Sequence, residues 1–211
     1  RVLDAGCGNG FLLERLRSQF PKLDLYGVEF TPELISIAQE KGIESCEISA
    51  GDLREGLPFD LDFDVIITER VIINILDYKD QKKALGHISK ALKKGGMLLQ
   101  SESYLEPFYE LNRARREVKL SPFNVSAHNL YLNEYMIAYM RDHLELIEVE
   151  ASIPKNFLSS HFYISRVFHP TVRPEGGKVR DSRMTRFFVE AVGPGIGNYS
   201  PILFRAFKKD T

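Results

Sequence analysis

The sequence predicts an α/β fold built on a doubly wound, mostly parallel sheet, and three observations favour this class. Short apolar runs alternate with helix-like segments through the first half of the chain. A glycine-rich turn follows the first apolar run, as in sheets that bind a ligand at the carboxyl ends of their strands. A chain of 211 residues can bury a substantial core, and we expect residues 1–211 to form a single domain.

Hydrophobic patterning orders the elements of the first half. The expected strands cover residues 1–5, 23–29, 45–49, 63–69 and 97–103. The expected helices cover residues 10–20, 31–42 and 79–96. Thr31 as N-cap and Pro32 in the first turn mark the start of the second helix, and Gly42 marks its end. The third, lysine-rich helix is expected to end in a glycine cap at residues 95–96.

The pattern is looser in the second half. An amphipathic segment at 106–118 precedes a loop through Pro122, a helix at 132–142 and a strand at 144–151. A last strand is expected within residues 200–208. The connection before it is far longer than most connections, so we interpret residues 152–198 as a helical lid insertion.

Composition excludes several classes of function. Lys and Arg total 28 against 29 Asp and Glu, which leaves no positive excess for holding nucleic acid. The sequence contains neither an apolar run of bilayer-spanning length nor a secretion signal, so a cytoplasmic location without a membrane span is expected. Cys7 and Cys46 are interpreted as reduced thiols. His87, His143 and His169 are scattered, and no metal site is expected.

The glycine-rich turn contains Gly6, Gly8 and Gly10, which permit a close approach of the backbone to a ligand. Glu29 ends the second strand at a spacing typical of an acid that accepts hydrogen bonds from both ribose hydroxyls. Asp52 follows the third strand, where a carboxylate can accept from the amine of adenine. The three features predict one crevice for an adenosine-containing ligand.

The spacing of the glycines separates two kinds of nucleoside ligand. Dinucleotide sites have the pattern G-x-G-x-x-G, whereas this turn reads G-x-G-x-G after Asp4. An acid beside the turn repels phosphate and suits a cation. NAD-linked oxidoreduction is therefore disfavoured.

Five segments in order resemble the successive motifs of class I S-adenosylmethionine-dependent methyltransferases: LDAGCGNG, YGVEF, AGDL, FDVIITERVIINIL and LKKGGMLLQSE. The resemblance implies a Rossmann-like, seven-stranded sheet with an antiparallel last strand. It assigns S-adenosylmethionine binding to residues 1–102, with S-adenosylhomocysteine as product, and substrate-side elements to 103–150. Family members carry helices before the first strand, so we expect part of the cap to be missing here.

The resemblance also implies roles for individual residues. The glycines hold the methionine part, Glu29 the ribose, and Asp52 with Leu53 the adenine, while Phe30 lies against the ribose or the base. The candidate cofactor-binding residues are Asp4, Gly6, Cys7, Gly8, Gly10, Glu29, Phe30, Asp52, Leu53, Glu69 and Arg70.

Methyl transfer to a hydroxyl needs in-line alignment, exclusion of water and removal of a proton. Many relatives place a histidine shortly after the fourth strand, but Asn74 stands there in this chain and can only orient a group. His128, in a polar stretch before a helix, is the candidate base. Glu102, at the end of the fifth strand, is expected to point into the crevice and either orient His128 or contact substrate.

Residues 101–134 and 193–209 resemble methyltransferases of bacterial polysaccharide or sugar-modifying pathways. This likeness implies transfer to a hydroxyl of a small or sugar-like acceptor. The candidate substrate-binding residues are Asn74, His161 and Tyr199, with Asn198 and Ser200 beside the last. Two alternatives stay open, namely an N-methyltransferase acting on an amino sugar or small amine, and a non-catalytic nucleoside-binding module.

Overall fold

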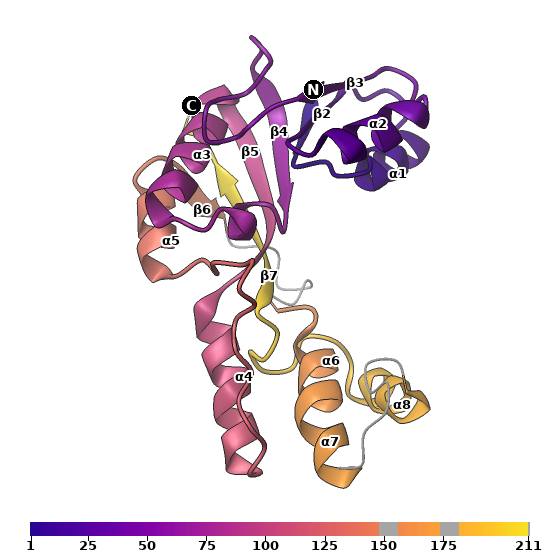
Figure 1. Cartoon of the computed structure of the whole chain (residues 1–211), viewed down its shortest axis with the longest axis vertical. Coiled ribbons are helices and arrows are strands. Elements are labelled where there is room, and N and C mark those ends of the chain that lie inside the picture. The colour runs from indigo at the N-terminus through magenta and orange to yellow at the C-terminus, as the bar shows by residue number, and fades with distance from the viewer. Residues whose placement is uncertain (148–155, 174–181, 211) are drawn as a thin grey trace.

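The protein is a seven-stranded α/β sheet above a layer of helices (Figure 1). The computed structural model describes residues 1–147, 156–173 and 182–210. Its strands are β1 (Val2–Ala5), β2 (Leu25–Glu29), β3 (Cys46–Ala50), β4 (Phe63–Glu69), β5 (Leu92–Ser103), β6 (Glu145–Ile147) and β7 (Ile202–Lys208). They are ordered β3-β2-β1-β4-β5-β7-β6. The first five pair in parallel and β7 pairs antiparallel with β5 and β6, which confirms the predicted fold class.

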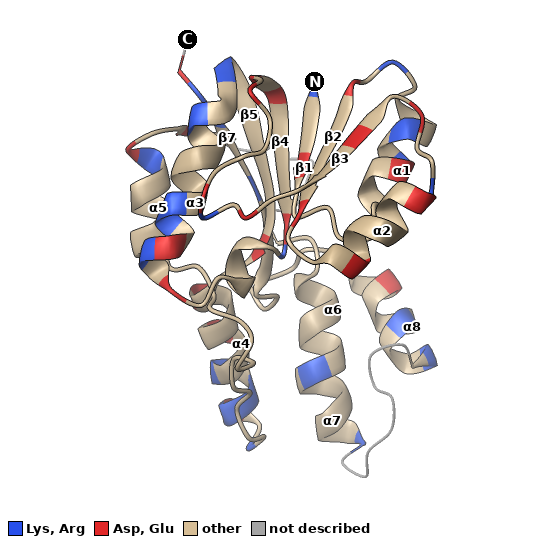
Figure 2. Ribbon diagram, turned by 45° about the horizontal axis from the view of Figure 1, so that its top comes forward, with Lys and Arg blue, Asp and Glu red and all other residues tan. Residues whose placement is uncertain are grey.

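Helices cover both faces of this sheet (Figures 1 and 2). The helices α1 (Phe11–Gln19) and α2 (Pro32–Glu40) lie on one side, with α3 (Tyr78–Ala91) and α5 (Glu134–Arg141) on the other. The second helix starts at Pro32 as predicted, but the Thr31 side chain makes no capping hydrogen bond. The N-cap of α3 is Asp77, whose side chain accepts hydrogen bonds from the amides of Lys79 and Asp80.

The boundary between α3 and β5 differs from the prediction. The helix ends at Ala91, and β5 begins at Leu92, where a helix through residue 96 and a glycine cap were expected. Gly95 has φ +74°, and a Cβ on Gly96 would lie 3.0 Å from the carbonyl oxygen of Phe63. The two glycines therefore form an irregularity inside the strand, where β4 and β5 approach closely, and the register between these strands shifts there.

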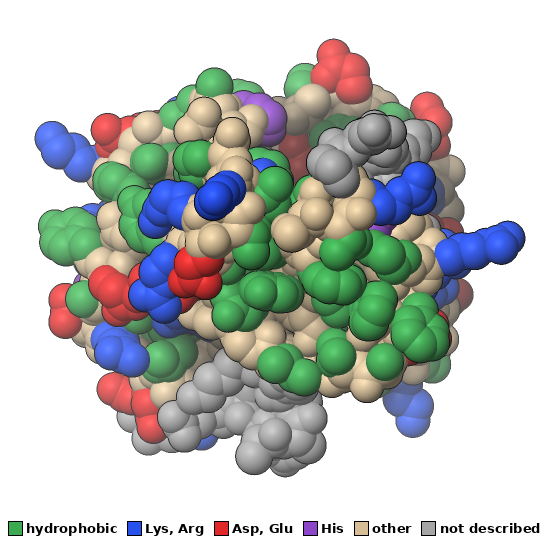
Figure 3. Space-filling model, turned by 90° about the horizontal axis from the view of Figure 1, so that it is seen from below, with side chains coloured by type: hydrophobic (Ala, Val, Ile, Leu, Met, Phe, Trp, Pro, Cys, Tyr) green, Lys and Arg blue, Asp and Glu red, His purple; other side chains and the backbone are tan. Residues whose placement is uncertain are grey.

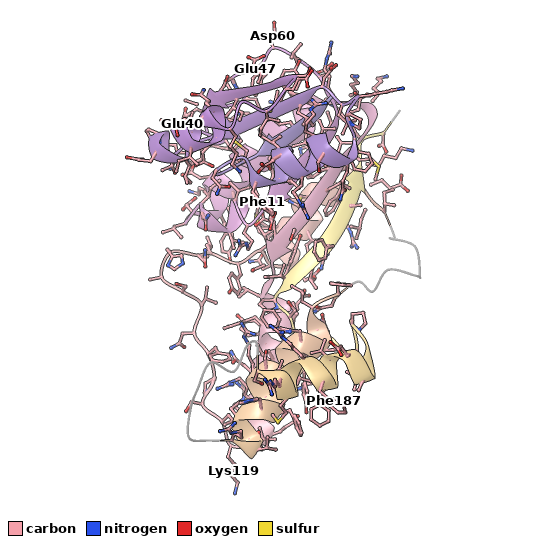
Figure 4. The ribbon with its side chains drawn as sticks, turned by 90° about the vertical axis from the view of Figure 1, so that its right-hand side faces the viewer. Phe11, Glu40, Glu47, Asp60, Lys119 and Phe187 are labelled. Atoms are coloured by element: carbon pink, nitrogen blue, oxygen red, sulfur yellow. The ribbon has the colours of Figure 1, made fainter. Side chains whose placement is uncertain are left out.

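A second layer lies beyond the carboxyl ends of the parallel strands. It contains α4 (Leu105–Glu117), α6 (Ser159–Tyr163), the π-helix η2 (Ile164–Phe168), α7 (His169–Val172) and α8 (Arg183–Val192). We call these helices, with the segment 118–133 between α4 and α5, the helical layer. Figure 4 marks its extent, with Lys119 and Phe187 far from Phe11 and Glu40 of the sheet layer. Seen from below, hydrophobic side chains gather between charged ones on this layer (Figure 3).

The helical layer includes the amphipathic segment and much of the predicted insertion. The segment 106–118 corresponds to α4, and α6 to α8 fall within residues 152–198. The strand expected at 144–151 is described only as β6, because residues 148–151 lie outside the described residues. None of the described helices is long and apolar enough to cross a membrane.

Each layer contains an apolar core of its own. The larger packs the centre of the sheet, including Leu3, Phe63 and Leu98, against α3 and α5. The smaller lies in the helical layer, where Leu111 and Ala114 of α4 pack against Phe162 and Val167. Because burying a Leu, Val or Phe side chain contributes roughly 1.5–3 kcal/mol, apolar packing stabilises the contact between α4 and η2, and Ile202 of β7 packs against the same cluster.

Candidate functional site

A cavity of about 1220 Å³ lies between the carboxyl ends of the strands and the helical layer. Its sheet-side wall is formed by the loops after β1, β2, β3 and β4. Its opposite wall is formed by α4, the 123–131 segment, η2 and the start of β7. Open α/β sheets bind ligands at this edge, so the cavity is the candidate site.

The glycine-rich turn contributes unequally to the wall. Gly6 and Gly8 line the cavity, both with left-handed backbones at φ +86° and +52°. A Cβ on Gly6 would collide with Val71, whereas a Cβ on Gly8 would meet nothing within 4 Å. Gly8 therefore borders open space, and Gly6 is required by packing.

The other two candidates from this turn are structural. Gly10 is absent from the cavity wall, and a Cβ there would lie 3.1 Å from Ala38. Cys7 is buried beneath Gly27, and burial raises the pKa of its thiol to about 12. Neither reaches the cavity, because Cys7 packs beneath β2 and Gly10 begins α1 in contact with α2.

Glu29 ties two segments of the wall together. Its Oε2 accepts from the amide of Gly8 and its Oε1 from the amide of Thr31, each at 2.9 Å. Phe30, beside it, is 67% exposed and lines the cavity. A carboxylate held by two amides is fixed in position, which suits recognition of a polar ligand group.

Asp52 and Leu53 lie on the same wall after β3. Asp52 is paired with Arg54 at 2.5 Å, and hydrogen bonding to that guanidinium lowers the pKa of Asp52. The Arg54 guanidinium lies 5.9 Å from the centre of the Phe30 ring. A ligand amine that binds Asp52 would therefore compete with Arg54.

Asp4 lies beneath the cavity and does not line it. Its side chain is 2% exposed, and burial, with the nearby charges of Glu69 and Glu29, raises its pKa to about 7. Glu69 does line the cavity. The acids nearest the glycine turn thus make this end of the cavity negative.

The prediction that Glu102 points into the crevice is wrong. Its side chain is fully buried, and its Oε1 accepts from the amides of Val71 and Ile72 at 3.1 Å each. Alternation along β5 turns Ser103 toward the cavity and Glu102 toward the 3₁₀ turn η1 (Ile72–Asn74). Burial raises the pKa of Glu102 to about 7, opposed by the backbone hydrogen bonds.

Glu102 instead shapes the wall indirectly. The turn that it holds presents Arg70 and Asn74 to the cavity. Arg70 has φ +52°, its amide donates to Ser101, and its carbonyl accepts from the Asn74 side chain at 3.0 Å. A left-handed arginine is an unusual conformation that the surrounding hydrogen bonds hold in place.

His128 lines the cavity from the helical layer, with Asn74 on the facing turn. The Asn74 Oδ1 accepts from Asn129 at 2.8 Å, which joins the two walls. Ser126 Oγ lies 2.8 Å from His128 Nδ1, so Ser126 orients this imidazole and Glu102 does not.

His161 and Tyr199 do not line the cavity, contrary to the prediction. Tyr199 lines a separate apolar hollow of about 390 Å³ and packs against Tyr163 with ring centres 4.7 Å apart. Asn198 binds the Asn156 side chain, and Ser200 is buried, so both shape the loop before β7. The helix from α6 to η2 turns Phe162 and Arg166 toward the cavity and leaves His161 off its wall.

Sequence reasoning missed most of the helical-layer wall. The additional lining side chains include Ser103, Phe108, Phe123, Tyr131, Phe162 and Arg166. Phe108 and Leu111 recur at helical spacing in α4, a signal that could have identified one wall but not what it faces. Within residues 1–147, 156–173 and 182–210, no group of three or more His, Cys, Asp or Glu side chains is arranged to hold a metal ion.

Comparison with known proteins gives matches to methyltransferases. A family described as a methyltransferase domain matches residues 1–152. Malonyl-[acyl-carrier protein] O-methyltransferase of Bacillus anthracis is 29% identical over 120 residues, covering 56% of this chain and 43% of that protein. Demethylmenaquinone methyltransferase of Thermus thermophilus is 32% identical over 107 residues, covering 48% and 46%. The chain therefore spans less than half the length of these curated relatives.

Two solved structures share the fold over the whole chain. The methyltransferase in complex with the Haloferax volcanii Trm112 activator has a TM-score of 0.62 at 18% identity, with 100% of this chain and 82% of that chain covered. The N-methyltransferase NodS of Bradyrhizobium japonicum, solved with S-adenosyl-L-homocysteine, has a TM-score of 0.56 at 16% identity, covering 100% and 78%. At these identities the likeness extends to the fold alone.

The raised pKa of Glu102 predicts a pH dependence of stability. A carboxyl with an ordinary pKa of 4.5 that rises to about 7 on folding binds more protons in the folded state between these values. Its stabilising contribution is complete below pH 4.5 and is lost as the pH rises through 7. Glu102→Gln keeps an acceptor for both amides and should reduce the fall in unfolding free energy between pH 5 and 8 by roughly 1–3 kcal/mol.

The measurement is urea unfolding of the wild type and the variant at both pH values. Glu47→Gln, at an exposed acid on β3, is the control and should leave the fall unchanged. An equal pH dependence in wild type and Glu102→Gln would contradict the assignment.

Proposed function

This chain belongs to the class I S-adenosylmethionine-dependent methyltransferase family, and we propose that it transfers a methyl group to an oxygen atom of a small acceptor bound in the cavity. The observation that carries the proposal is the convergence of Gly8, Glu29 and Asp52 on one cavity that continues beneath the helical layer. The cavity thus has a nucleoside end and a second end with space for an acceptor.

The residues at the nucleoside end fit the cofactor of this family. Gly8 borders open space that a Cβ would enter, as expected beside the methionine part. Glu29 is fixed where a carboxylate can accept from ribose hydroxyls, while Asp52 and Leu53 would hold the adenine and Phe30 would lie against ribose or base.

We assign Arg70 to the methionine carboxylate. Arg70 lies on the wall between the nucleoside end and the acceptor end, beside Glu69. Its left-handed backbone is held by Ser101 and Asn74, so the side chain starts from a fixed point on the wall, from which its guanidinium can pair with the ligand's own carboxylate. The carboxylate of Glu69 would form an ion pair with the ammonium group of the same ligand.

The bound cofactor supplies a methyl group activated by a sulfonium centre. The acceptor oxygen forms the new bond to carbon while the bond from sulfur breaks and its electron pair stays on sulfur. When the acceptor is a hydroxyl, a ring nitrogen of His128 takes the released proton, with the imidazole oriented by Ser126.

The acceptor that this site suits is a hydroxyl-bearing, small or sugar-like molecule. Phe108, Phe123, Tyr131 and Phe162 give the acceptor end aromatic walls, and aromatic rings pack against the apolar faces of sugars. Asn74 and Asn129 add polar groups that can orient hydroxyls.

Gly8→Ala tests the nucleoside end. The new methyl group would enter space that the ligand needs, so affinity for S-adenosylhomocysteine measured by calorimetry should fall at least about tenfold, which is about 1.4 kcal/mol. Gly42→Ala is a matched control, because Gly42 has φ +58°, equally open surroundings and no place on the cavity wall. Both variants carry a similar backbone strain, so equal affinities of the two for S-adenosylhomocysteine would contradict the proposal.

His128→Ala tests the proton transfer. With a hydroxyl acceptor found by screening for uptake of labelled methyl, kcat should fall about 100-fold or more while affinity for S-adenosylhomocysteine is unchanged. His143→Ala removes an exposed imidazole outside the cavity and should have no effect. If His128→Ala keeps full activity, the acceptor needs no base, as for a neutral amine, and if no acceptor is methylated although the cofactor binds, the chain is a binding module.

A further inference from the structure

The segment 118–133, which carries His128, is attached to the rest of the protein at two places. Its first part, residues 121–123, is bound by side chains of α4. Its last part, residues 129–132, is bound by the loop after β4 and by the end of β5. His128 lies in the turn 126–129, directly before the second attachment. The position of its imidazole on the cavity wall therefore depends on how residues 129–132 are held.

Gln81 of α3 binds this attachment from outside the cavity. Its side chain is fully buried and does not line the cavity. Its Nε2 donates to the carbonyls of Ile72 and Ile75, at 3.1 and 3.0 Å, and to that of Leu130, at 2.8 Å. The first two carbonyls belong to the loop after β4, and the third belongs to the segment that follows His128. One amide group thus binds both segments.

Further hydrogen bonds join the same two segments. The Leu130 amide donates to the carbonyl of Ile73 at 2.7 Å, and the Asn129 side chain donates to that of Asn74 at 2.8 Å. These bonds link the two segments directly. Gln81 adds a contact to both of them from α3, a helix that packs against the centre of the sheet. It thereby fixes the pair of segments relative to the core.

The chemistry of this position favours a glutamine. Carbonyl oxygens carry partial negative charge, and three that converge in a buried place need hydrogen-bond donors between them. The Nε2 of Gln81 offers two hydrogens without bringing a charge into the core. A carboxylate of similar size would repel the three carbonyls, and a thioether would leave them without this donor. The site therefore requires a neutral donor on a side chain of this length.

We propose that Gln81 is a positioning residue for methyl transfer, which holds His128 in place on the cavity wall by binding the carbonyls of both segments. The inference rests on the proposed function, in which His128 takes the proton of the acceptor. Loss of the Gln81 amide should slow proton transfer and leave binding of the methyl donor unchanged. At the nucleoside end, Glu29 is held by the amides of Gly8 and Thr31 instead.

Hydrogen exchange, measured by nuclear magnetic resonance, tests the attachment without an acceptor. Gln81→Met keeps the length of the side chain but removes both donor hydrogens. The Leu130 amide should then exchange at least about tenfold faster than in the wild type. The Gly6 amide, which donates to the carbonyl of Val28, reports on the sheet and should change by a clearly smaller factor. The ring signals of His128 should shift, because the imidazole is no longer held in one position.

Gln100→Met is the matched control. Gln100 is a buried glutamine on β5 that does not line the cavity, and its Oε1 accepts from the Tyr104 hydroxyl at 3.1 Å. The variant therefore removes a buried amide of the same size from another part of the core. Its Leu130 exchange and its His128 signals should match those of the wild type.

Gln81→Glu tests the need for a donor at the same position. Its protonated carboxyl still offers one hydrogen, whereas its carboxylate offers none and repels the three carbonyls. Protection of the Leu130 amide, corrected for the intrinsic exchange rate, should fall between pH 5 and pH 8 by a larger factor than in the wild type. The wild type is the reference because Glu102, which binds amides of the same loop, titrates in this range.

The same variant at pH 5 supplies the measurement if Gln81→Met does not fold. An equal fall in the protection of Leu130 in Gln81→Glu and in the wild type would argue against the role of the donor.

Kinetics test whether Gln81 acts through His128. With the hydroxyl acceptor found by methyl uptake, Gln81→Met should lower kcat about tenfold or more, while affinity for S-adenosylhomocysteine stays within about twofold. In the His128→Ala background the same substitution should lower kcat by less than about twofold, because the group that Gln81 positions is already absent. A merely structural role would lower kcat by the same factor in both backgrounds.

Three further results would overturn the inference: unchanged exchange of Leu130 in Gln81→Met, an equal acceleration at Leu130 and Gly6, or an equal loss of kcat in the two backgrounds. Failure of every acceptor to be methylated by the wild type would instead count against the proposed function. The exchange rates and the His128 signals would still show whether Gln81 holds the imidazole in place, so the two failures are distinguishable.

Discussion

The site depends on the order in which the chain lays down its parallel strands. From β1 the chain moves outward through β2 to β3, then crosses back to place β4 on the other side of β1. The loops after β1 and β4 consequently diverge and leave a crevice between them at the carboxyl edge. Among the described residues, the acids on the cavity wall lie at the last positions of β2 and β4 or directly after β3, so the topology itself gathers the groups to which we assign nucleoside recognition.

The position of residues at strand ends was predictable, because parallel strands bring their carboxyl ends to one edge of the sheet. Gly8, Glu29 and Asp52 belong to short motifs directly after strands, and the parallel sheet brings such motifs together. Glu102 shows the limit of this reasoning. It also lies at a strand end, but one residue of offset decides whether a side chain faces the crevice or the core, and the pattern "SES" does not reveal that phase.

The helical layer was less predictable, because its residues meet only through tertiary packing. No local pattern relates Arg115 to the backbone of Arg166, fifty-one positions later, or Phe108 to the ring of Tyr131. His161 was selected for its residue type, yet the helix phase brings Phe162 and Arg166 to the cavity instead. Gly95 and Gly96 were expected to end a helix but lie in an irregularity of β5. Glycine is favoured at both kinds of position, so the residue type alone does not distinguish them.

The Arg115 contacts have a consequence for how such a protein diversifies. Arg115 of α4 donates to the carbonyls of Ser121 and Arg166 and stacks on Phe123, so it joins three segments of the acceptor wall, while the nucleoside wall is built from strand ends and loops of the sheet. Substitutions on the cavity face of α4 or η2 can therefore remodel the chemistry that is accepted without disturbing how the methyl donor is gripped. The acceptor wall and the nucleoside wall can therefore change independently during evolution, so related proteins can differ in acceptor while they keep the same way of binding the methyl donor.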